Sequence, residues 1–223
     1  MPIRYSVFSE PGDRRTMQDS VVHLYDTDSD KGLFMVCDGM SGLYKGDAAS
    51  LTVADVFSKV WELHHNDQDI TTMIVESIAQ ARQDLEMLTT NNTGTTMVMA
   101  AVEGGVFTIA HLGDSRGYYL RRGEGLVYRT KDHVTINDEG WSYVSKGFYN
   151  YGPIYQPEMT MVTAQAGDRI LLCSDGVSNC ISEDMLLKML QTEMEPSSTL
   201  SELYAHCDTH ARDDYSAILI EVV

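Results

Sequence analysis

Five aspartates stand where the sequence pattern predicts that strands begin or end: Asp19, Asp38, Asp114, Asp175 and Asp213. Asp38 and Asp175 each close an apolar run and precede a glycine, which lets backbone approach a ligand closely. One Asp-Gly pair alone is more often a plain turn. Five carboxylates brought together at one edge, however, repel one another unless positive charge lies between them. Because Mg²⁺ and Mn²⁺ prefer oxygen ligands, the joint pattern predicts a site for such ions.

Two such ions would suit phosphoryl transfer. Held about 3.5–4 Å apart, they bridge a water, lower its pKa and clamp the transferring phosphoryl group. Arg14, five residues before Asp19, offers the planar fork that binds a phosphate monoester. Taken singly, Asp19 would be a surface residue and Arg14 a solvated cation, so the hypothesis rests on the set.

The composition excludes some partners. The chain has 223 residues, with 33 Asp and Glu against 16 Lys and Arg, a formal net charge of −17. This excess of acid argues against nucleic acid, because phosphate backbones are bound by basic surfaces. The excess of acid is consistent with cation binding, although most of these acidic side chains are expected to be exposed to solvent.

The four cysteines are Cys37, Cys173, Cys180 and Cys207, and they form no C-x-x-C pair and no zinc spacing. Free thiols in apolar runs are typical of a reducing cytoplasm. The amino-terminal residues lack the pattern of a secretory signal, and no apolar run approaches membrane-spanning length. We therefore expect a cytoplasmic protein without a membrane partner.

Hydrophobic periodicity predicts the order of the elements. Strands are expected at 3–8, 20–25 and 32–38, then at 95–103, 106–114 and 116–122, and finally at 169–173 and 216–223. A helix from about residue 47 has an apolar face made of Leu51, Ala54, Phe57, Val60 and Trp61, and a second amphipathic helix covers 70–88. Two more helices are expected at about 183–194 and 198–211, and residues 131–157 are expected to form a loop or flap.

This order predicts one domain over residues 1–223. Two sheets packed together, each covered by a helix pair, give a four-layer α/β/β/α sandwich of the α+β class. His111 falls inside a predicted strand and His133 in the flap, so neither is expected to act as a catalytic base. No G-x-S-x-G nucleophile motif occurs.

Seven motifs resemble those of the metal-dependent Ser/Thr protein phosphatases, the PPM or type 2C family. They are GDRRTMQDS (12–20), VCDGMSG (36–42), TGTTMVMA (93–100), AHLGDSRGYYL (110–120), TKDH (130–133), AGDRILLCSDG (166–176) and RDDYSAILI (212–220). They occur in the family's order and span nearly the whole chain. The resemblance also implies the four-layer sandwich.

The resemblance implies a role for each candidate residue. Asp38 would bridge two Mn²⁺ or Mg²⁺ ions, and the carbonyl of Gly39 would serve one of them. Asp19, Asp175 and Asp213 would complete the two-ion site. Asp114 is the position associated with a weaker third ion, and Arg14 is the phosphate-binding position.

This chain departs from the family pattern at four places, of which one is Ser41 in place of the usual second glycine of the Asp-Gly motif. Met40 stands where many relatives have a histidine after the Asp-Gly pair, as in many bacterial members, so the leaving-group proton must come from another source. Asn179 replaces an aspartate that helps to hold the third ion. SKGFYNYGPIYQPEM replaces the usual sequence after the flap, which bears on substrate selection.

The expected function is hydrolysis of phosphoserine and phosphothreonine in proteins by a metal-bridged hydroxide, by a monomeric signalling enzyme of bacterial type. The expected partners are Ser/Thr kinases or their phosphorylated substrates. Two alternatives stay open: a phosphatase dedicated to one phosphorylated regulator, and a pseudophosphatase that binds but does not turn over. The four metal aspartates and Arg14 count against the second.

Overall fold

Two five-stranded antiparallel sheets form the centre of the computed structural model, which describes residues 1–14 and 16–223. The first sheet has the order β1 (Ile3–Glu10), β14 (Tyr215–Val222), β13 (Arg169–Cys173), β7 (Arg116–Arg121) and β8 (Gly125–Arg129). The second has the order β12 (Glu158–Thr163), β6 (Val106–Leu112), β5 (Met97–Glu103), β3 (Lys31–Asp38) and β2 (Asp19–Asp26). Two short pairs lie outside them: β4 (Gly94–Thr95) with β11 (Phe148–Tyr149), and β9 (Val134–Ile136) with β10 (Ser142–Val144).

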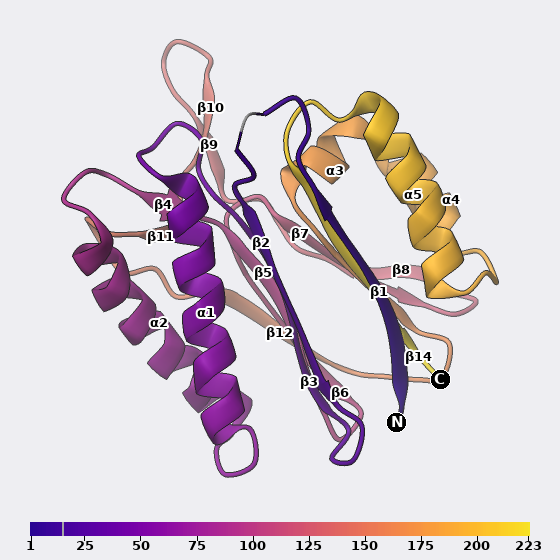
Figure 1. Ribbon diagram of the computed structural model, residues 1–223. Coiled ribbons are helices and arrows are strands. Elements are labelled where there is room, and N and C mark those ends of the chain that lie inside the picture. Colours follow the sequence, from indigo (N-terminus) through magenta and orange to yellow (C-terminus); the bar gives the residue numbers. More distant parts are fainter. Residues whose placement is uncertain (15) are drawn as a thin grey trace.

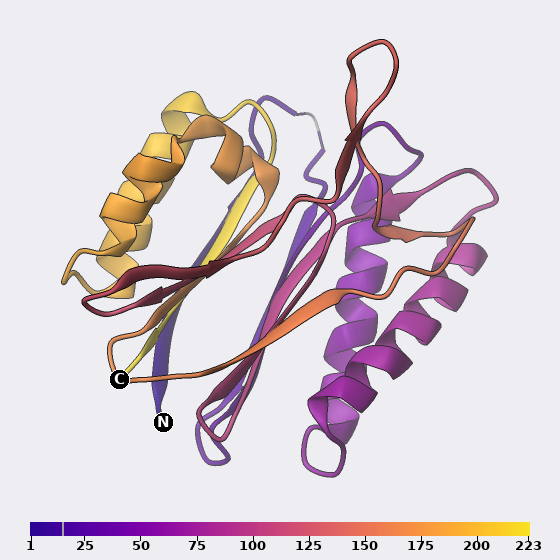
Figure 2. The ribbon, with the colours of Figure 1, turned by 180° about the vertical axis from the view of Figure 1, so that it is seen from behind.

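Helices cover the outer face of each sheet (Figures 1 and 2). Helices α1 (Gly46–His64) and α2 (Ile70–Leu88) pack on the second sheet. Helices α4 (Glu183–Leu190) and α5 (Pro196–His210) pack on the first, and the short α3 (Asp175–Cys180) follows β13 directly. The expected four-layer sandwich is confirmed.

The strand β3 shows why its sequence is apolar without a break. Phe34 and Val36 point into the layer between the two sheets, whereas Met35 and Cys37 point to α1 and α2. Successive side chains of a strand face opposite sides, and both sides of β3 are buried. The strand therefore keeps its apolar character up to Asp38, where it reaches the edge of the sandwich.

The structure corrects three details of the sequence-based expectation. Leu51 is 55% exposed and does not belong to the buried face of α1. The strands β8 and β12 were not expected, because both are edge strands in which no side chain is buried, so apolar residues do not mark a covered face. The flap, residues 131–157, contains the β9–β10 hairpin, which closes through a hydrogen bond from the Ser145 N–H to the His133 carbonyl and a turn at Asn137.

Within the described ranges, every helix is too short or too polar to cross a lipid bilayer.

Candidate active site

The pairing of β2 with β3 places two carboxylates opposite each other. Asp19 is the first residue of β2, Asp38 is the last residue of β3, and the antiparallel register makes them direct partners. Like charges directly opposite across a strand pair are destabilising. This register is therefore unfavourable unless a cation or a proton neutralises the pair.

The other three aspartates join the same cluster from different elements. Asp175 opens α3, Asp213 precedes β14, and Asp114 follows β6. Burial raises the pKa of Asp38, and the nearby carboxylates of Asp19, Asp175 and Asp114 raise it further. Burial also raises the pKa of Asp175, with a further contribution from Asp213. The cluster lies at the end of the sandwich opposite the two termini, where the β9–β10 hairpin projects (Figure 1).

The residues fit divalent cations. Both carboxylate oxygens of Asp19 are buried, and the residue is only 7% exposed. Neither oxygen has a hydrogen bond of regular geometry, although the hydroxyls of Ser174 and Ser216 lie near enough to lower the pKa of Asp19. Burial raises the pKa of Asp19 to about 7 and that of Asp114 to about 6. A buried carboxylate is costly unless it is paired or binds a metal ion. The buried oxygens of Asp19 are therefore suited to act as ligand atoms for a cation.

Backbone also reaches the cluster. A Cβ atom on Gly39 would collide with the carbonyl group of Gly46 at the start of α1. Only glycine lets the chain just after β3 pass this close to α1. The peptide group between Asp38 and Gly39 therefore lies beside the carboxylates. The cavity at this end has a volume of about 420 Å³, and its lining includes Asp38, Gly39, Asp114, Asp175 and Asp213.

Two threonines form hydrogen bonds with the backbone N–H and carbonyl of Asp38. The Thr95 hydroxyl donates to the Asp38 carbonyl at 2.7 Å, and the Thr96 N–H donates to the same oxygen at 2.9 Å. The Asp38 N–H donates to Thr96 Oγ1 at 3.1 Å, and that hydroxyl also contacts Ser115 Oγ at 2.7 Å. No such role was assigned to Thr95 and Thr96 from the sequence. The signal that could have revealed this role is the run of hydroxyl side chains before a buried strand.

We expect Thr96→Val to remove the side-chain hydrogen bond that positions the Asp38 backbone. Thr96 is 2% exposed, so the valine leaves the buried Asp38 N–H without its acceptor, at a cost of about 1–3 kcal/mol in the free energy of unfolding. A shift of the Asp38 carboxylate should lower kcat/KM by roughly tenfold or more. Chemical denaturation and steady-state kinetics measure the two effects. Thr52→Val, which removes a hydroxyl bonded within α1, is the control, and equal behaviour of the two variants would contradict the role of Thr96.

Arg14 lies beside the aspartate cluster, and its guanidinium already binds a carboxylate of that cluster. Its guanidinium donates to the carboxylate of Asp213, and this hydrogen bond raises the pKa of Arg14. The Gln18 N–H donates to the Asp214 carboxylate at 2.7 Å, which holds the backbone next to Asp19. Sequence reasoning missed Asp214, although the doublet Asp213-Asp214 signals it.

The departures from the family pattern also lie here. Met40 lines the cavity, and a Cβ atom on the flap residue Gly147 would meet the Met40 methyl group. Asn179 donates to the Asp175 carboxylate at 3.2 Å, where an aspartate would repel it. Three flap tyrosines line the cavity opposite the carboxylates: Tyr143, Tyr149 and Tyr151.

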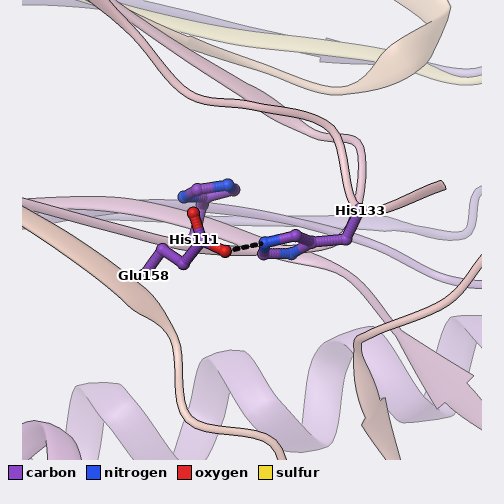
Figure 3. A group of neighbouring side chains, drawn as sticks. All are labelled: His111, His133 and Glu158. Atoms are coloured by element: carbon purple, nitrogen blue, oxygen red, sulfur yellow. Dashed lines mark hydrogen bonds and ion pairs between the residues drawn. The ribbon is translucent and has the colours of Figure 1, made fainter.

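A second group of potential metal ligands, His111, His133 and Glu158, lies at the base of the flap (Figure 3). The Gly113 N–H donates to His133 Nδ1 at 3.2 Å, so the ring proton of neutral His133 is on Nε2, which lies 2.9 Å from Glu158 Oε1. The two imidazole rings are stacked, with centroids 4.6 Å apart. One cation cannot lie in the planes of both rings. This group therefore ties β6, the flap and β12 together, and neither histidine contributes to the aspartate cluster.

A larger cavity, about 680 Å³, lies at the end that holds the termini. Four arginines line it, and each is paired with an acid: Arg4 with Glu195 and Glu221, Arg169 with Glu221, Arg121 with Asp168, and Arg122 with Glu193. Because these charges are already neutralised, the cavity has no free cation for an anionic substrate among its described side chains.

The fold and the aspartate cluster are typical of the protein phosphatase 2C family. A model of the protein phosphatase 2C family matches residues 13–219, and the chain belongs to this family.

Bacterial relatives agree with this assignment. The serine/threonine protein phosphatase PstP of Mycobacterium tuberculosis is 31% identical over 217 residues, which cover 85% of this chain but 39% of PstP. The chain thus spans well under half the length of that relative. The serine/threonine phosphatase stp of Listeria monocytogenes is 22% identical, with 88% of this chain and 86% of the relative covered.

Solved structures confirm the fold. The catalytic domain of PstP in complex with two manganese ions is 26% identical, with a TM-score of 0.80 over 99% of this chain and 98% of that domain. The serine/threonine phosphatase of S. agalactiae superposes with a TM-score of 0.84 at 22% identity, over the full length of both chains.

Proposed function

We propose that this chain is a metal-dependent phosphatase that hydrolyses phosphoserine and phosphothreonine in proteins. The observation that supports the proposal is the buried aspartate cluster, in which burial and the neighbouring carboxylates raise the pKa of Asp38. The names of the relatives PstP and stp support the same activity.

In this proposal two Mn²⁺ or Mg²⁺ ions are held by Asp19, Asp38, Asp175, Asp213 and the Gly39 carbonyl. The two manganese ions in the PstP catalytic domain support this number. When bound, such ions polarise phosphoryl oxygens and make a coordinated water acidic near neutral pH. Asp114 would contribute to a third, weaker site, in which Asn179 supplies no carboxylate.

The protein's own groups orient the substrate. The Arg14 guanidinium, which donates to Asp213 in this structure, would donate two hydrogen bonds to phosphate oxygens when a substrate binds beside the cluster. Met40 carries no titratable proton, so it cannot protonate the leaving oxygen, and solvent in the open cavity supplies that proton. The tyrosines of the flap form the wall against which the chain around the phosphorylated residue would lie.

We further propose that residues 1–223 act as one catalytic domain. The protein would act as a monomer in the cytoplasm, on phosphorylated Ser/Thr kinases or their substrates. The names of the relatives PstP and stp support phosphorylated proteins as the substrates.

A panel of phosphopeptides tests the proposed activity. Peptides of one sequence carrying phosphoserine, phosphothreonine or phosphotyrosine are incubated with the protein in Mn²⁺ and in excess EDTA, and released phosphate is measured. We expect hydrolysis of the first two in Mn²⁺ and none in EDTA. Hydrolysis of phosphotyrosine alone would contradict the substrate class. Hydrolysis of p-nitrophenyl phosphate without any peptide turnover would favour a phosphatase dedicated to one partner.

Removal of Arg14 should weaken substrate binding. We expect Arg14→Ala to raise KM by roughly tenfold or more, since a charge-assisted bidentate contact contributes about 1.5–3 kcal/mol, and Arg14→Lys to restore part of it. Arg129→Ala, which breaks a surface ion pair with Glu183, is the matched control. Unchanged KM values for both Arg14 variants would remove Arg14 from the phosphate site.

A further inference from the structure

Two cysteines far apart in the sequence meet behind the aspartate cluster. Cys180 is the last residue of α3, and Cys207 lies in the last turn of α5. Their Sγ atoms are 3.4 Å apart, although 27 residues separate them. Sequence reasoning treated all four cysteines as unconnected free thiols, since no spacing motif joins these two.

Access distinguishes Cys180 from the other cysteines. Cys37, Cys173 and Cys207 are completely buried, whereas Cys180 is only partly buried. Contact with Cys207 lowers the pKa of the Cys180 thiol. A reagent from solvent can therefore reach Cys180 first, and a resolving thiol lies in contact with it.

The two thiols lie on the segments that carry two of the candidate metal ligands. Cys180 follows Asp175 by five residues within α3, and Asn179, its neighbour, donates to the Asp175 carboxylate. Cys207 precedes Asp213 by six residues at the end of α5. His206 Nε2 contacts the Cys180 carbonyl at 3.1 Å, so the two helix ends are already joined by a hydrogen bond.

We propose that Cys180 and Cys207 form a reversible disulfide that draws the end of α3 toward α5 and weakens the divalent-cation site at Asp175 and Asp213. A disulfide bond is about 2.05 Å long, so the sulfurs must approach from 3.4 Å, and the ends of both helices must absorb the movement. The effect on the cation site rests on the proposed function, whereas formation of the disulfide does not.

The oxidant is a small-molecule disulfide. The Cys180 thiolate attacks one of its sulfurs and releases one small thiolate, which leaves a mixed disulfide on Cys180. Cys207 then loses its proton and attacks Cys180 Sγ, which expels the second small thiolate. Two protein thiols are oxidised, one small disulfide is reduced to two thiols, and the two protons pass to these products.

Mass spectrometry of the native protein treated with glutathione disulfide tests the first part. We expect a loss of two hydrogens per chain, a linked Cys180–Cys207 peptide, and reversal by dithiothreitol, while Cys37 and Cys173 stay free. Cys207→Ala should stop at a stable glutathione adduct on Cys180, and Cys180→Ser should not react. A persistent glutathione adduct on Cys180 of the wild-type protein, or no reaction, would overturn the proposal.

Calorimetric titration with Mn²⁺ tests the second part without any assay of turnover. We expect the oxidised wild-type protein to bind Mn²⁺ roughly tenfold more weakly than the reduced protein, the scale on which supporting contacts act on metal affinity. Cys180→Ser treated in the same way should show no change. Equal Mn²⁺ affinity of the two wild-type forms would overturn the link to the cation site. Absence of Mn²⁺ binding to the reduced protein would instead contradict the proposed function.

Discussion

Replacement of Asp38 by asparagine is expected to abolish phosphatase turnover and, at the same time, to stabilise the metal-free protein. In the proposed site Asp38 helps to hold both ions, whose charge stabilisation amounts to several kcal/mol, so turnover should fall by roughly a thousandfold or more. Without metal, the substitution replaces a buried carboxyl group of raised pKa, directly opposite Asp19, by a neutral amide that can donate to the Asp19 carboxylate. A gain of about 1 kcal/mol or more in the free energy of unfolding follows from relief of like-charge repulsion and burial.

Urea denaturation in EDTA near neutral pH measures the stability, and p-nitrophenyl phosphate hydrolysis in Mn²⁺ measures the turnover. Asp55→Asn, at an exposed position of α1, is the matched control and should leave both quantities near their wild-type values. An Asp38→Asn protein that is both less stable in EDTA and still active would contradict the assignment of Asp38 as a shared metal ligand.

The stability of the metal-free protein should depend on pH through Asp19. Its pKa in the folded protein, about 7, lies above the unfolded value of about 3.9, so the folded state holds the proton more tightly. The stability that this proton contributes is fully present below about pH 4 and is lost as the pH rises through about 7. Relative to Asp19→Asn, the wild-type protein in EDTA should therefore lose on the order of 4 kcal/mol across this window, as measured by urea denaturation at a series of pH values.

Mn²⁺ should reverse this loss. A ligand at about 100 times its dissociation constant stabilises the folded state by about 2.7 kcal/mol per site, and protons compete with it for the same carboxylates. The increase in thermal midpoint on adding Mn²⁺ should therefore be larger at about pH 7.5 than at about pH 5. Differential scanning calorimetry at the two pH values measures it. An equal increase at both, or none, would contradict cation binding by the raised-pKa carboxylates.

Much of the fold could be predicted from the sequence because buried side chains recur along a strand or a helix at the period of that element. The unbroken apolar run of β3 and the three-and-four spacing in α2 follow from which faces are covered. Edge elements lack this signal, so β12 and the β9–β10 hairpin were not expected. The β9–β10 hairpin forms through backbone bonds and turn residues instead of a buried face.

The candidate site could be predicted only in part. Its aspartates were found by their positions at strand ends and by the family motifs. That Asp19 pairs directly with Asp38 is a matter of strand register, which local pattern does not fix. The hydroxyl support from Thr96 and the meeting of Cys180 with Cys207 depend on contacts between distant segments, which spacing along one sequence does not reveal.

Hydrolysis of p-nitrophenyl phosphate tests the central claim most directly. The rate is measured for the wild-type protein, Asp38→Asn and Asp55→Asn, each in Mn²⁺, in Mg²⁺ and in excess EDTA. We expect turnover by the wild-type protein and Asp55→Asn in Mn²⁺ or Mg²⁺, none in EDTA, and none by Asp38→Asn under any condition. Folded wild-type protein without turnover in either metal would contradict the enzyme and leave a phosphate-binding module.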